Sequence, residues 1–479
     1  MQKNSIIFIT LSILVSSLFL NSAMAGDLEW SGIYRVEGNF LKNSELDKDG
    51  KEKTYGLHHL VLRPKIVAGD GLTIYGQFGL LNNPTDYPNS QMGQVWGSGV
   101  GNGAPTSANN SNTLSQTQKS ETIEVTQLYL TFTQEYGSLL VGRAPLHFGL
   151  GLTHNAGRGS FDHWFDTRDL VGYKFVVGNL FFMPMIGKSS EKNIHNSDDV
   201  NDYMFHFQYE NPETDLEMGV YYWMRKASNQ GGDAPAGAPL GGAGATATGD
   251  VDMRTVSLYA LRHDDNLHLG MEAAFQTGET GILSSGDNVS LSGFGIAAEF
   301  DYRATDSKFK WSLRAGSASG DDPSTSAKYE GFIFDRNYDV AMMMFNHSLG
   351  QADFLGTNLQ TGAVRDAEGN IYRADVEAIS NVIYLAPSVR YHFTDRWSWD
   401  NKVVTGWLAT NPLAGSVPAR DPGKEIGYEF DTAVNFTPRK GITWINQAGF
   451  LFPGSAWRGD GQFDSKFGFG LATKAAISF

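Results

Sequence analysis

The end of the chain alternates strictly between apolar and polar positions. One face carries Phe467, Phe469, Leu471, Thr473, Ala475, Ile477 and Phe479, and the other carries Lys466, Gly468, Gly470, Ala472, Lys474, Ala476 and Ser478. Side chains of a β-strand point to opposite faces in turn, so this segment predicts a strand with one apolar and one polar wall. A strand between lipid and water has this pattern. The last strand of a soluble β-sandwich would also have it.

Similar alternation recurs along the chain, broken by connections of two lengths. Short turns are predicted at 68–71, 135–138, 177–179, 211–214, 263–266, 303–307, 394–396 and 437–441. Longer polar connections are predicted near 42–54, 83–121, 151–167, 189–200, 227–250, 279–289, 320–374, 409–423 and 453–462. These connections join about 18 strands, and the ambiguous stretches 145–170 and 320–374 leave 16 to 20 open.

This segregation of connection lengths predicts the fold class. Bacterial barrels place short turns at the periplasmic end and long loops outside, whereas a soluble sandwich has no reason to do so. We therefore expect an all-β protein, a transmembrane antiparallel up-and-down β-barrel with short periplasmic turns and long extracellular loops.

The first residues predict export. A basic start at Lys3 precedes an apolar run from Ile6 to Leu20, and Ala23-Met24-Ala25 follows as a small-x-small cleavage site. We expect residues 1–25 to be a cleaved secretory signal peptide and 26–479 a single outer-membrane barrel domain. No later run approaches the ~18 apolar residues of a spanning helix, so an exported chain that still crosses a membrane must do so as a closed barrel. A soluble periplasmic protein is the alternative.

Composition narrows the possible classes. The chain has 55 Gly, 30 Phe, 19 Tyr and 10 Trp, which suits many strands with close turns and aromatic girdles at two membrane interfaces. It has no Cys, which excludes a disulfide framework, thiolate metal sites and cysteine nucleophiles. The net charge of −15 argues against nucleic acid as a partner, because phosphate backbones require a concentrated basic surface.

Two long connections differ from the rest. Residues 231–249 are low-complexity and lack apolar bulk, so an exposed loop is expected. Residues 319–370 instead carry large apolar side chains, including the run Met342 to Phe345, which favours burial in the barrel mouth. An additional hairpin in the wall is the alternative. The constriction-loop candidates are Asp321, Asp322, Phe332, Phe334, Asp335, Arg336 and Asp339.

Strand parity also predicts which charged residues face the lumen. A charge on the lipid face costs up to ~2–4 kcal/mol near the midplane, so charged positions are assigned inward. Basic and acidic groups are nearly balanced among them, and we expect many to pair across strands and brace the wall. The pore-lining candidates are Arg35, Glu37, Arg63, Lys65, Arg143, Arg225, Glu272, Glu299, Arg314, Arg390, Asp400, Lys402, Glu429 and Asp431.

Several short motifs resemble a known family. Residues 140–143 (LVGR) followed by Phe148-Gly149 are similar to a strand and loop of porin-like channels. In order, residues 319–321 (SGD), 427–431 (GYEFD) and 452–454 (FPG) resemble pieces of the alginate-export type of outer-membrane porin. The resemblance implies an eighteen-stranded barrel that carries an acidic polysaccharide or another solute. A polyanion channel should have a strongly basic constriction, which the balanced lumen charges do not match.

Residues suited to catalysis or metal binding are present without a supporting motif. His147, His154 and His163 lie near Ser160, Asp162 and Asp166 in one connection, but no GxSxG elbow accompanies them. Acidic loop residues offer oxygen ligands of the kind that Ca²⁺ prefers, but none follows EF-hand spacing, and solvated charge is the simpler interpretation. We predict neither an enzyme nor a cofactor.

The sequence thus predicts a channel in the outer membrane of a Gram-negative cell that allows passive or weakly selective diffusion of small solutes. One alternative is an export channel for an acidic polysaccharide. Another is a plugged, non-conducting surface barrel acting in adhesion or as a receptor. The expected partners are outer-membrane lipid and lipopolysaccharide, together with small solutes or an oligosaccharide. Either a monomer or a trimer is compatible with the sequence.

Overall fold

The fold is taken from a computed structural model. It describes residues 26–479 except 49, 82–91, 93, 96–122, 191–198, 228–248, 285–286, 326, 353, 355–363, 366–370, 373–377 and 415–419. The expected signal segment and nearly all of the low-complexity stretch 231–249 therefore lie outside the described residues. The described part of the chain contains no helix with the length and hydrophobicity needed to cross a membrane.

Eighteen long strands form the wall. They are β1 (Asp27–Lys42), β2 (Glu52–Gly69), β3 (Leu72–Leu80), β5 (Glu124–Gln134), β6 (Gly137–Pro145), β7 (Thr167–Val177), β8 (Leu180–Ser190), β9 (Val200–Asn211), β10 (Leu216–Ala227), β11 (Val251–His263), β12 (Leu267–Ser284), β13 (Asp287–Tyr302), β14 (Phe309–Ala318), β18 (Val382–His392), β19 (Trp397–Leu408), β20 (Glu425–Phe436), β21 (Ile442–Pro453) and β22 (Gly468–Ser478).

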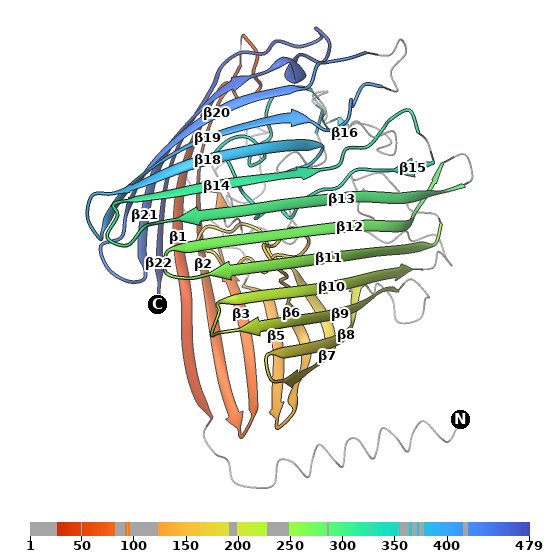
Figure 1. The fold of residues 1–479 in the computed structure, drawn as a ribbon, viewed down its shortest axis with the longest axis vertical. Coiled ribbons are helices and arrows are strands. Elements are labelled where there is room, and N and C mark those ends of the chain that lie inside the picture. The colour runs from red at the N-terminus through yellow and green to blue at the C-terminus, as the bar shows by residue number, and fades with distance from the viewer. Residues whose placement is uncertain are drawn as a thin grey trace, which may run out of the picture.

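The wall is a closed antiparallel ring. Each long strand pairs with the next one along the chain, and β22 returns to pair with β1, with Ile477 opposite Tyr34 and Thr473 opposite Gly38. In Figure 1 the colours follow this order around the wall, so that the red first strands lie beside the blue last ones. This closure confirms the predicted fold class and the count of 18.

The connections follow the predicted division. All eight short turns separate consecutive strands at the predicted places, and the long connections leave the opposite ends of the strands. One long connection differs from the prediction, because β12 and β13 continue through 279–289 until only two residues separate them. A register shift between Glu279 and Leu283 hides this extension, since it breaks the strict alternation on which the prediction relied.

The segment between β14 and β18 adds no strand to the ring. Its described residues contain only β15 (Lys328–Tyr329), which pairs with the edge of β13, and the small separate pair β16 (Val364–Arg365) and β17 (Ile371–Tyr372). A further short strand, β4 (Gln94–Val95), pairs with β2. The alternative of an additional wall hairpin in 320–374 is therefore wrong.

The two faces of the wall differ in the way that a lipid-embedded barrel requires. Large apolar side chains are exposed on the outside, whereas inward positions between them include fully buried residues such as Ala274 and Ala297. Exposed aromatic residues gather near both strand ends. Trp311, Trp397 and Trp444 lie near the short turns, and Trp407, Tyr428 and Phe452 lie near the long connections. Such an apolar band between two aromatic girdles is the surface of a membrane-spanning barrel.

Deleting Phe479 should lower the yield of folded barrel. The backbone of Phe479 exchanges two hydrogen bonds with Gly32 of β1, at 2.9 and 3.1 Å, and its ring packs over the glycine. The deletion therefore removes the last contacts that close the ring. The measurement is the amount of heat-modifiable barrel in isolated membranes. Phe393→Ala, which alters an exposed aromatic residue at a turn, is the control, and equal yields of the two variants would contradict the prediction.

Candidate functional site in the barrel lumen

The inner wall is braced by ion pairs between neighbouring strands. Arg390 of β18 makes a bidentate contact with Asp400 of β19, at 2.6 and 2.7 Å. Arg314 of β14 contacts Asp301 of β13 at 2.7 Å and Glu299 at 3.4 Å. These residues lie on the faces opposite the exposed apolar side chains. Paired in this way, the charges largely neutralise one another.

Arg225 belongs to a buried cluster of charged residues, and strand alternation predicted its inward direction but not its partners. It shares the carboxylate of Asp202 with Arg168, and both guanidinium Nε atoms lie 2.9 Å from an Asp202 oxygen. Asp202 is fully buried, so two cations surround one desolvated anion. Neither Arg168 nor Asp202 was among the candidates. The sequence could have assigned both residues to the lumen, because the large apolar residues of β7 and β9 mark the outward face of each strand and place both charges on the inward face.

Arg143 does not face the lumen. It makes a bidentate contact of 2.8 Å with Asp169 of β7, and Asp169 shares its face with the exposed Val171. On β6 both faces are apolar near this point, so alternation could not assign the direction. Both charges lie near the ends of their strands beside the connection 146–166, away from the membrane midplane, where an outward ion pair costs less.

The connection 146–166, here called the first inner loop, folds into the barrel. The carboxylate of Glu272 on β12 accepts hydrogen bonds from the backbone N–H groups of three consecutive residues, Leu150, Gly151 and Leu152, at 2.7 to 3.3 Å. On the opposite part of the ring, Glu37 of β1 lies 2.7 Å from the His163 ring. This loop was not predicted to fold inward, although its aromatic residues could have indicated it.

The connection 319–381, the second inner loop, is anchored by the same device. Backbone N–H groups of Met343 and Met344 each donate to Glu429 of β20 at 2.7 Å, and that of Met342 donates to Asp431 at 3.0 Å. On β19, the ammonium group of Lys402 donates to the carbonyl of Val340 at 2.9 Å. Charged side chains of three wall strands, β12, β19 and β20, therefore hold the backbone of the inner loops.

Apolar side chains of the second inner loop pack against the wall as expected. Phe332, Phe334, Met343 and Met344 are almost completely buried in one cluster with residues of β13, β18 and β20. Gly295 of β13 makes room for the two phenylalanines, because a Cβ there would lie 2.6 to 2.7 Å from their ring atoms. Burying each large side chain stabilises the inward position by roughly 1.5–3 kcal/mol.

The remaining constriction candidates divide into two groups. Asp321 is buried and accepts the N–H of Glu330, and Asp322 caps the turn at Ser324, so both carboxylates serve the loop's own backbone. Asp339 is exposed. Arg336 lies over the Trp164 ring at 4.2 Å, and Asp335 lies where the two inner loops meet.

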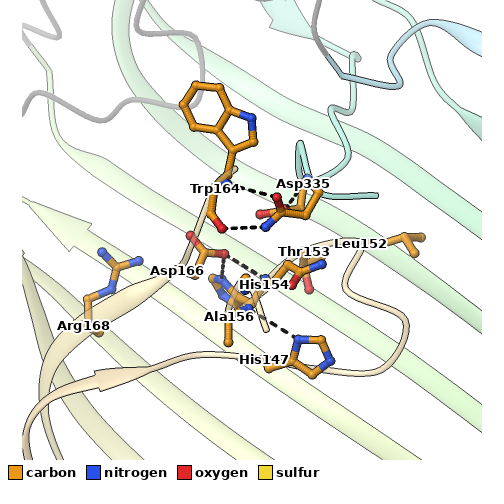
Figure 2. A network of polar contacts seen from close by, with 12 residues as sticks. His147, Leu152, Thr153, His154, Ala156, Trp164, Asp166, Arg168 and Asp335 are labelled. Atoms are coloured by element: carbon orange, nitrogen blue, oxygen red, sulfur yellow. Dashed lines mark hydrogen bonds and ion pairs between the residues drawn. The ribbon is translucent and has the colours of Figure 1, made fainter. Parts of the chain in front are cut away.

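The two inner loops are joined by reciprocal hydrogen bonds (Figure 2). The side-chain amide of Asn337 accepts the N–H of Trp164 at 3.0 Å and donates to its carbonyl at 2.7 Å. The N–H of Asp335 donates to the carbonyl of Leu152 at 2.8 Å. The loops therefore form one unit inside the barrel.

The histidine cluster of the first inner loop stabilises the loop itself. His154 lies 3.2 Å from Asp166, and the N–H of Ala156 donates to Nδ1 of His147 at 3.4 Å. Burial lowers the pKa of His147 to about 4, which keeps this acceptor neutral at ordinary pH. These contacts give a structural role to residues that the sequence offered as catalytic candidates.

Two carboxyl groups face one another where the inner loops meet. Burial, together with the negative charge of Asp166, holds the pKa of Asp335 well above its usual range. Burial acts in the same direction on Asp166, but the hydrogen bond and charge interaction with His154 outweigh it and keep the pKa of Asp166 low. Asp335 is therefore the member of the pair that keeps its proton.

Raising the pH should loosen the contact between the inner loops. The folded-state pKa of Asp335 is raised, so its stabilising proton is present at low pH and is lost as pH rises through that value. Hydrogen exchange of amides 332–346, corrected for the intrinsic base-catalysed rate, should then accelerate in the wild type. Asp335→Asn mimics the protonated form and should abolish the acceleration, whereas the control Asp322→Asn should retain it. The same pH dependence in Asp335→Asn would contradict this account.

Comparison with known proteins gives structural neighbours only. No protein-family model matches the chain, and no curated protein matches it by sequence. A BenF-like porin from Pseudomonas fluorescens Pf-5 is similar over 95% of this chain and 99% of its own, at 10% identity and a TM-score of 0.49. OccK9 (OpdG) of Pseudomonas aeruginosa is similar over 94% of this chain and 99% of its own, at 11% identity and a TM-score of 0.49. The outer membrane channel DcaP of Acinetobacter baumannii is similar over 96% of this chain and 99% of its own, at 12% identity and a TM-score of 0.43.

Proposed function

We propose that the chain is an outer-membrane channel through which small solutes diffuse passively and with weak selectivity. Its lipid-facing band supports residence in a membrane, and the expected signal peptide over 1–25 would direct it to the Gram-negative outer membrane. An eighteen-stranded wall is wide enough to leave an aqueous lumen unless something narrows it. The inner loops are the parts that narrow this one.

The arrangement of the second inner loop is the observation that carries the proposal. Its large apolar side chains are turned against the wall, while Asp339 is exposed and Arg336 is only partly buried. A loop placed in this way reduces the bore and leaves polar groups along the remaining path. Fixed charges at such a constriction set ion preference.

The pairing of the wall charges supports weak selectivity. Arg35, Arg225, Arg314 and Arg390 each lie within 3.3 Å of a carboxylate oxygen, so these four arginines form no continuous basic track along the described part of the inner wall. Export of an acidic polysaccharide would require such a track and is not favoured. The partly exposed candidates on the inner wall are proposed to line the same path, and they are Arg63, Lys65, Glu299, Asp400 and Lys402. Glu37, Glu272, Glu429 and Asp431 are buried against the inner loops instead.

A plugged surface barrel is the second candidate. The buried cluster between the second inner loop and the wall favours it, because a loop so firmly packed could close the lumen completely. Conductance separates this candidate from an open channel.

Replacing residues 325–365 with a short Gly/Ser linker should raise single-channel conductance clearly in a planar bilayer and shift cation/anion preference. The replacement removes the packed segment together with Arg336 and Asp339. A shortened 228–248 connection serves as the control and should leave conductance unchanged. If the wild type conducts and the replacement has no effect, the second inner loop lies outside the path. If only the variant conducts, the barrel is plugged.

Epitopes should reveal which end of the barrel faces outward. One inserted between Ala227 and Asp250 should be labelled on intact cells, because long connections are expected outside. One inserted in the turn between Asn211 and Leu216 should be labelled only after the outer membrane is permeabilised. Labelling with the opposite pattern would invert the proposed topology, and periplasmic recovery of the unmodified protein would overturn the membrane location.

A further inference from the structure

A small cleft lies between the wall and the first inner loop, and several of its buried polar atoms lack partners. It is lined by Arg35 of β1, His59 and Arg63 of β2, and Gly157, Ser160 and Asp162 of the loop. Both ring nitrogens of His59, and Nε and one terminal nitrogen of Arg35, are buried without a hydrogen-bond partner among the described residues. Buried polar groups are nearly always satisfied, so these atoms indicate a missing occupant.

The donors in the cleft outnumber the acceptors. Arg35 is 4% exposed and His59 is 1% exposed, so bulk water does not satisfy them. The other terminal nitrogen of Arg35 donates to the backbone carbonyl of Asp162, and the ion pair with Glu37 at 3.3 Å makes no hydrogen bond with Nε. The guanidinium group of Arg35 therefore still offers several N–H donors, and His59 must offer at least one.

The charge of the surroundings favours an anion over a water molecule. Arg35 and Arg63 both interact electrostatically with His59, and Arg158 of the loop adds a further positive charge beside Arg63. Glu37 opposes them. His163 binds its Oε1 atom, and its Oε2 atom is a buried acceptor without a hydrogen-bond partner among the described residues. A water molecule accepts about two hydrogen bonds and carries no charge, so it would leave donors unsatisfied.

Asp162 does not prevent anion binding. Its carboxylate accepts the N–H of Gly159 at 2.6 Å and lies against that glycine. Burial also raises the pKa of Asp162, which reduces the free-energy cost of neutralising it when an anion approaches.

The size of the cleft limits what can bind. Its cavity volume is about 10 Å³, which is room for roughly one water-sized sphere. We propose that this cleft is a binding site for a small monovalent inorganic anion, chloride in the first instance, held by Arg35, His59 and Arg63 beneath the first inner loop. The bound ion would join the wall to the loop, and this role is independent of what passes through the lumen.

Bromide provides a direct test, because it scatters anomalously and substitutes for chloride. Crystals of the wild-type protein soaked in sodium bromide should show an anomalous peak within hydrogen-bond distance of Arg35 and His59. Absence of this peak, with ordinary water density in its place, would overturn the proposal.

Unfolding in urea tests the same site in solution. At constant ionic strength, replacing gluconate by chloride at ten times its dissociation constant should lower the unfolding equilibrium constant about tenfold. His59→Phe and Arg63→Gln should lose this dependence. Lys65→Gln is the matched control, since Lys65 lies on the same strand but pairs with Glu29, and it should keep the dependence. Equal chloride dependence in His59→Phe and the wild type would overturn the site, as would stabilisation by formate without stabilisation by chloride.

Discussion

The whole molecule depends on the closure of one ring of backbone hydrogen bonds. In lipid an unpaired strand edge has no water to satisfy it, so the first and last strands must find each other. The pairing of β1 with β22, extended by Phe479 and Gly32, meets that requirement. Once the ring is closed, every wall residue has a fixed side, and the division into a lipid-facing and a lumen-facing surface follows from the two-residue period of a strand.

Closure creates an interior that the wall alone cannot fill. Buried carboxylates need donors, and loop backbone carried into a confined space needs acceptors. Glu272 and Glu429 meet both needs, because each accepts N–H groups from consecutive residues of an inner loop. Acidic residues that parity assigns to a pore therefore serve here as anchors for the inner loops. Because many of these charged residues anchor loops or pair with one another, the lumen contains many charges without a strong excess of either sign.

Alternation along the chain sufficed to predict the ring, the strand count and the eight short turns, because these depend on local periodicity and turn residues. Alternation failed where both faces of a strand are apolar, because it then does not show which face points to the lumen. Arg143 lies in a strand with apolar residues on both faces, and only the neighbouring β7 shows that it points outward. The cluster of Arg168, Asp202 and Arg225, and the meeting of Asp335 with Asp166, depend on residues brought together by closure. Spacing along the sequence carries no record of such contacts.

The first inner loop has a mechanical consequence for the barrel. It begins at β6, bonds to Glu272 on β12, reaches Glu37 on β1 and returns to β7, so it ties three well-separated sectors of the ring together. A hollow cylinder flattens easily under lateral pressure, whereas one with an internal crossbeam resists becoming elliptical. The bore should therefore keep its cross-section as the tension and thickness of the surrounding bilayer change.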